Sequence, residues 1–96
     1  MNELEEIKEV LKTHKKYLKQ KFYVDKLGIF GSFSKGEETS ESDVDILVEI
    51  NGPVGWEFFD LKDLLEENLH RNVDLVTLDS LKPLLRERIL KEVIFI

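Results

Sequence analysis

Cysteine is absent from this chain. Its absence excludes a disulfide, a thiolate metal site and a cysteine nucleophile. Two prolines and five glycines are too few for a disordered or proline-rich chain. No apolar run approaches the roughly 18 residues that a membrane span requires, and residues 1–6 are acidic where a secretion signal would be basic. These absences predict a soluble protein of the reducing cytoplasm, without a membrane partner.

Basic residues are also fewer than acidic ones, 14 against 20, so the formal net charge is -6. A chain of this charge is repelled by a phosphate backbone, which argues against direct nucleic-acid binding and favours a basic protein partner. The chain has 96 residues, of which 42% are hydrophobic. That length supports one hydrophobic core, so we expect a single domain over residues 1–96.

Hydrophobic periodicity predicts alternating helices and strands. The expected elements are a helix over residues 3–21, strands over 26–30 and 43–50, a helix over 54–69, a strand over 73–77 and a last helix over 81–93. Asp79 or Ser80 is expected to cap that last helix, with Pro83 in its first turn. The order αββαβα predicts an α/β (α+β) fold, a small mixed sheet covered by helices.

Acidic residues mark the polar face of two expected strands. Asp43 and Asp45 are two residues apart, so they point to the same face with Cα atoms roughly 6.6 Å apart. Asp74 lies between apolar residues on the strand over 73–77. If the two strands pair in register, the three carboxylates meet. Unpaired charges about 5 Å apart would repel by about 3 kcal/mol per pair at an effective dielectric of 20, and two Mg²⁺ ions would remove that repulsion.

A glycine-bounded loop precedes the acidic pair. Gly31 permits a tight turn, Ser32 is a candidate helix cap, and backbone N–H groups there could hold a phosphate. Lys35 could contact phosphate or remain a solvated surface lysine. The loop lacks the Lys and Ser/Thr of a Walker A motif, and residues 43–54 lack the glycine and glutamate of an EF-hand.

The pattern of a hydrophobic residue, Gly31-Ser32, a spacer and Asp43-Val44-Asp45 resembles the nucleotidyltransferase superfamily related to DNA polymerase beta. The short chain is similar to the superfamily's minimal members, the MNT domains. The resemblance implies metal-binding and catalytic roles for Asp43, Asp45 and Asp74. It also implies nucleotide contacts from Gly31, Ser32 and Lys35, the last where many relatives carry arginine.

The same resemblance implies a chemistry and a partner. MNT proteins act as antitoxins beside a HEPN-domain toxin, so we expect a type VII-like toxin–antitoxin pair forming a hetero-oligomer. The expected reaction is Mg²⁺-dependent transfer of AMP from ATP to a hydroxyl, a tyrosine of the toxin, with two Mg²⁺ ions bound. The alternatives are a catalytically weak module that neutralises the toxin by contact, and a nucleotidyltransferase for a small-molecule alcohol.

Overall fold

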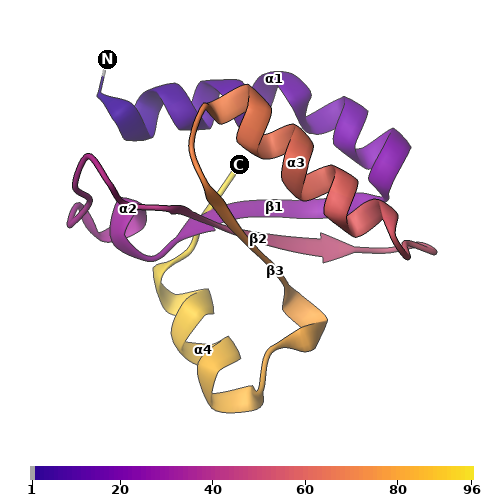
Figure 1. Cartoon of the computed structure of the whole chain (residues 1–96). Coiled ribbons are helices and arrows are strands. Elements are labelled where there is room, and N and C mark those ends of the chain that lie inside the picture. Colours follow the sequence, from indigo (N-terminus) through magenta and orange to yellow (C-terminus); the bar gives the residue numbers. More distant parts are fainter. Residues whose placement is uncertain (1) are drawn as a thin grey trace.

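A computed structural model of the chain describes residues 2–96 and shows helices on both sides of a twisted sheet (Figure 1). In chain order the elements are α1 (Glu3–Phe22), β1 (Val24–Phe30), α2 (Ser32–Lys35), β2 (Val44–Ile50), α3 (Glu57–Leu69), β3 (Val73–Thr77), the 3₁₀ helix η1 (Leu78–Ser80), α4 (Pro83–Glu92) and β4 (Ile94–Phe95). The predicted α/β class, with a small mixed sheet covered by helices, is confirmed.

The four-stranded sheet has the order β3-β2-β1-β4. β1 is antiparallel to both of its neighbours, β2 and β4, whereas β2 and β3 are parallel. A parallel pair needs a crossover connection, and α3 supplies it. The sheet is therefore mixed, and the starts of β2 and β3 lie at the same end.

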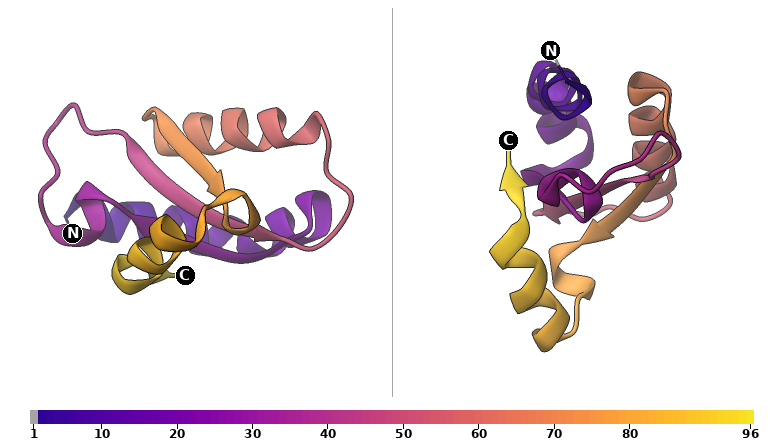
Figure 2. Two further views of the ribbon diagram at one scale, coloured as in Figure 1. Left: turned by 90° about the horizontal axis from the view of Figure 1, so that it is seen from below. Right: turned by 90° about the vertical axis from the view of Figure 1, so that its left-hand side faces the viewer.

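One face of the sheet forms the main core with α1 and α3, which lie side by side above it (Figures 1 and 2). Alternate residues of β2, namely Val44, Ile46 and Val48, are fully buried in this core. Asn2 caps α1 by accepting a hydrogen bond from the Glu5 backbone N–H at 2.8 Å. Among the helices of residues 2–96, none is both long and apolar enough to cross a membrane.

The opposite face carries a smaller core and the acidic residues. Leu47 is buried there with Phe30, Leu78 of η1 and Ile89 of α4. Because side chains alternate along a strand, Asp45 of β2 points to the same face as Leu47. This face is covered only in part, by η1 and α4 (Figure 2).

The expected elements match the observed ones within a few residues, but the start of the last helix differs. Lys82, not Asp79 or Ser80, stands at the N-cap of α4, so that prediction is wrong. Asp79 and Ser80 cannot cap α4 because they fold into η1, where the Ser80 hydroxyl donates a hydrogen bond to the Thr77 carbonyl at 2.8 Å. Pro83 does begin α4, as predicted.

Candidate active site

Two carboxylates face each other across the parallel pair of strands. Asp45 of β2 and Asp74 of β3 are aligned in register, and both point to the face opposite α1 and α3. Asp43 directly precedes β2 and is exposed, as is Asp74, whereas Asp45 is half-buried. The register that the sequence left open therefore brings the predicted strand carboxylates together.

The pKa of Asp45 reports this crowding of negative charge. Burial raises the pKa of Asp45 from 3.8 to about 6, with further contributions from the charges of Asp74 and Asp43, a side-chain hydrogen bond with Asp74, and the charge of Glu92. Desolvation and like charges both disfavour the ionised form of a carboxyl group. A strongly perturbed carboxyl group flanked by other acids is a candidate functional group.

Gly31 lies against the Asp45 carboxylate. Its φ of 74° and ψ of -147° belong to a region that residues with a side chain rarely adopt. A Cβ atom built on Gly31 would overlap Oδ2 of Asp45. Glycine is therefore required here both for backbone conformation and for space.

The turn after Gly31 forms α2, a single helical turn. Gly31 is its N-cap and Ser32 its first residue, so the prediction that Ser32 caps the helix is wrong. The cap position demands the glycine-only conformation described above, and the hydroxyl of Ser34 instead donates to the Gly31 carbonyl at 2.8 Å. Ser32 is half-exposed.

Lys35, the predicted phosphate contact, forms an ion pair with Glu92 of α4, with Nζ and Oε2 3.6 Å apart. About half of the Lys35 side chain is exposed. Glu92 was not singled out from the sequence, because it lies far from Lys35 along the chain and no local pattern marks it. The pair links the glycine turn to α4.

Arg71 is a second residue that sequence reasoning missed. Its guanidinium donates to the Ser42 carbonyl at 3.2 Å, pairs with Glu3 at 2.7 Å and lies 5.2 Å from the ring centroid of buried Phe33. These contacts join the loop before Asp43 to α1 and α2. The one available signal was an arginine two residues before an alternating strand.

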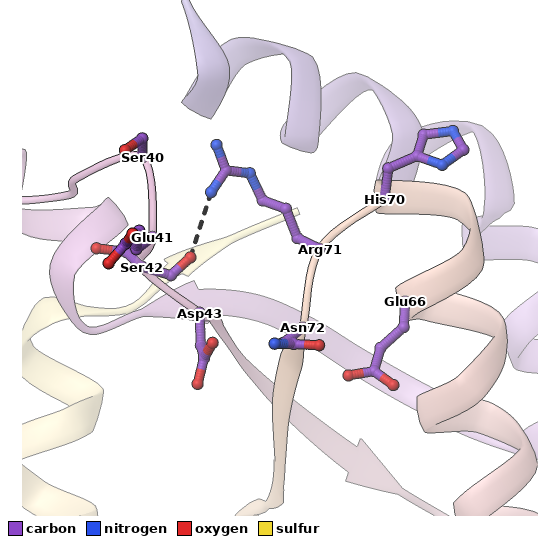
Figure 3. Close-up of a pocket in the computed structure, with 8 residues that line it drawn as sticks. All are labelled: Ser40, Glu41, Ser42, Asp43, Glu66, His70, Arg71 and Asn72. Carbon is purple, nitrogen blue, oxygen red and sulfur yellow. Dashed lines mark hydrogen bonds between the residues drawn. The ribbon is translucent and has the colours of Figure 1, made fainter.

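A polar pocket of about 530 Å³ opens beside Asp43 (Figure 3). It is lined by Ser40, Glu41, Ser42, Asp43, Glu66, His70, Arg71 and Asn72. Glu66 accepts a hydrogen bond from the backbone N–H of Val73 at 2.8 Å, which lowers the pKa of Glu66 and ties α3 to the start of β3. His70, which lines the pocket, is exposed.

The donor set suits a hard cation, although it is not a complete cage. Within residues 2–96, no group of three or more His, Asp or Glu side chains is arranged so that it could hold a metal ion. Mg²⁺ is usually bound by one or two carboxylates together with substrate phosphates. Asp45, crowded by Asp74, offers oxygen ligands of this kind, so the residues fit an ion that is completed by a bound nucleotide.

A mixed sheet that presents paired aspartates beside a Gly-Ser turn defines an enzyme of the nucleotidyl-transferring class. The chain belongs to the nucleotidyltransferase domain family, whose sequence model matches residues 11–96. It is 43% identical over 94 residues to the protein adenylyltransferase MntA of Thermococcus cleftensis, covering 97% of this chain and 95% of that protein.

Two solved structures share the fold. One, provisionally described as a minimal nucleotidyltransferase, is 32% identical with a TM-score of 0.72 and covers 93% of this chain and 87% of its own. The other is a crystal structure of a toxin–antitoxin with AMP-PNP, 25% identical with a TM-score of 0.71, covering 99% of this chain and 72% of that one. The predicted minimal nucleotidyltransferase fold is thus confirmed.

Proposed function

We propose that this protein transfers AMP from ATP to a hydroxyl of a partner toxin, a HEPN-domain protein, and so acts as the antitoxin of the pair. The observation that carries the proposal is the alignment of Asp45 with Asp74 beside Gly31. Relatives named protein adenylyltransferase, and a related toxin–antitoxin structure with AMP-PNP, support it. The chain is proposed to work in the cytoplasm as one domain.

Each predicted site residue has a proposed role. Asp43 and Asp45 hold Mg²⁺, and Asp74 is the third carboxylate. Bound Mg²⁺ would neutralise charge on the triphosphate and orient it for in-line displacement. The backbone at Gly31 and the hydroxyl of Ser32 contact the phosphates. The third phosphate contact, Lys35, must leave its ion pair with Glu92 to reach the phosphates.

The proposed reaction forms one bond and breaks another. The acceptor oxygen, proposed to be that of a tyrosine, attacks the α-phosphorus of ATP, and the bond between that phosphorus and the bridging oxygen breaks to release pyrophosphate. Asp74 is exposed and therefore accessible to the incoming hydroxyl. A carboxylate within hydrogen-bond reach of that hydroxyl can take its proton.

The direct test is incubation of the purified protein with α-labelled ATP, Mg²⁺ and the protein encoded by the adjacent gene. We expect label on the partner, lost on the order of 100-fold or more in the Asp43→Asn/Asp45→Asn variant, as when a preorganised electrostatic group is removed. Asp25→Asn, at an exposed site on β1, is the matched control and should retain activity. A stable complex without label would instead favour neutralisation by contact alone.

A further inference from the structure

The segment over residues 78–92, which we call the α4 arm, projects from the sheet. It comprises η1, a short connection and α4. Figures 1 and 2 show it on the side of the sheet opposite α1 and α3, with the start of α4 farthest from the sheet and its end returning to β4. The arm therefore presents the first turns of α4 to the surroundings.

Apolar side chains at the tip of this arm lack cover. Residues 82–88 are all exposed, including Leu84 at 85% and Leu85 at 45%. Within α4, all of which the structure describes, Ile89 alone is buried. A helix of ten residues is marginal in water without packing of an apolar face, and adjacent exposed leucines are typical of a protein contact surface.

The charge at the tip differs in sign from that of the whole chain. Lys82, Arg86 and Arg88 outnumber the single acid Glu87 over residues 82–88, although the chain carries a net charge of -6. A basic surface around exposed leucines complements a partner surface that is apolar at its centre and acidic at its rim. A two-fold contact between two copies of the arm would instead set one basic tip against the other, and that like-charge contact opposes self-association through this surface.

The arm also lies next to the candidate active site. Leu47, the buried neighbour of Ile89 and Leu78, is two residues from Asp45 on the same face of β2. The end of α4 reaches the glycine turn through the Lys35–Glu92 ion pair. A protein that covers the arm would therefore face the carboxylates.

We propose that the α4 arm docks the acceptor protein and holds its hydroxyl over Asp45 and Asp74. This inference rests on the proposed function, because it assigns the surface that binds the protein receiving AMP. Exposed Trp56 and Phe59 form another apolar patch, but they lie at the start of α3, on the helix layer behind the sheet. Their rings pack together, with centroids 5.9 Å apart.

The test uses the full chain and the protein encoded by the adjacent gene. Leu84→Ser and Arg88→Glu change exposed side chains, so both variants should keep the melting temperature of the wild type and its shift with Mg²⁺ and AMP-PNP. We expect each to raise the dissociation constant for the partner about tenfold or more, the effect of a central contact residue. Phe59→Ser is the matched control, expected to bind as the wild type does.

Binding and AMP transfer are measured separately so that two failures can be told apart. Binding that is weakened by the arm variants but never yields labelled partner would support the docking surface and contradict the proposed reaction. Labelling and affinity unchanged in both arm variants would overturn the docking inference and leave the reaction standing. Three other results would also overturn the docking inference. They are loss of binding in Phe59→Ser alone, a wild type that self-associates while the arm variants are monomeric, and no binding of the partner by the wild type.

Discussion

At the residue scale, the tightest constraint in the site joins a backbone position to a carboxylate. Gly31 and Gly36 bracket α2, and both have positive φ, 74° and 71°. They differ in surroundings: a Cβ on Gly31 would meet Asp45, whereas a Cβ on Gly36 would meet nothing within 4 Å. They also differ in backbone, because the ψ of -147° at Gly31 lies in a region open almost only to glycine, whereas the ψ of 22° at Gly36 is left-handed helical. Gly36 therefore reports left-handed strain alone, and Gly31 reports a larger backbone cost together with crowding of the carboxylate.

We expect Gly36→Ala to lower the free energy of unfolding by about 1–2 kcal/mol, the usual cost of a left-handed non-glycine residue. Gly31→Ala should cost more, because its backbone conformation is open almost only to glycine and because Asp45 must move as well. It should also abolish the shift in melting temperature with Mg²⁺ and AMP-PNP. Urea denaturation and thermal melts of the two variants provide the comparison. Equal stability and equal nucleotide shifts would refute the proposed closeness of Gly31 and Asp45.

The raised pKa of Asp45 predicts a pH-dependent stability cost. The folded protein holds the Asp45 proton more tightly than the unfolded chain, whose value is near 3.8. Stability from this group is therefore full below about pH 4, and is lost as pH rises through about 6. The Asp45→Asn substitution keeps the shape of the side chain and removes its negative charge.

Without divalent metal, Asp45→Asn should melt a few degrees above the wild type at pH 7.5, with the difference shrinking toward pH 4. Differential scanning fluorimetry across this pH range measures it. Asp25→Asn, outside the acidic group, should show no such pH-dependent gain. A variant that melts at or below the wild type at pH 7.5 would mean that Asp45 is not destabilised by its neighbours.

At the element scale, alternation and helical spacing predicted the main helices and strands well. The apolar alternation of Val73 and Leu75 around Asp74 was sufficient to predict β3. The register of β3 against β2 was not predictable, because one residue of slip leaves the local pattern unchanged while it moves every side chain to the other face. The structure resolves this by pairing Asp45 with Asp74.

Short elements escaped prediction because tertiary contacts create them. β4 has two residues, Ile94 and Phe95, and exists by pairing with β1. Two residues cannot display a period, so no pattern could have marked them as a strand. The contacts of Arg71 likewise depend on three segments that are distant along the chain.

Arg71 holds those segments together, so its removal should loosen the loop before Asp43. We expect Arg71→Ala to reduce the free energy of unfolding by about 2 kcal/mol, from one charge-assisted hydrogen bond and a cation–π contact. Glu3→Gln removes only the exposed ion pair and should cost well under 1 kcal/mol. Urea denaturation compares them, and equal losses would show that the contacts to Ser42 and Phe33 contribute nothing.

At the scale of the whole molecule, the two faces of the sheet are covered unequally. A full layer of α1 and α3 covers one face, whereas only η1 and α4 lie on the other (Figures 1 and 2). The acidic pair therefore lies on an accessible face, with the α4 arm beside it. A protein acceptor could approach this face without the domain opening.

The proposed function depends on Asp43, Asp45 and Asp74 binding a nucleotide together with Mg²⁺. Stabilisation by a ligand at about 100 times its dissociation constant is about 2.7 kcal/mol, which corresponds to a rise of roughly 10–20 °C for a domain of this size. Mg²⁺ and AMP-PNP together should produce this rise, whereas either alone should give little.

The most direct measurement is this melting-temperature shift in the wild type and in Asp43→Ala/Asp45→Ala, each compared with its own ligand-free melt. We expect a large shift in the wild type and none in the double variant, with Asp25→Asn behaving as the wild type. An undiminished shift in the double variant would mean that the nucleotide binds elsewhere and that these aspartates are not its site.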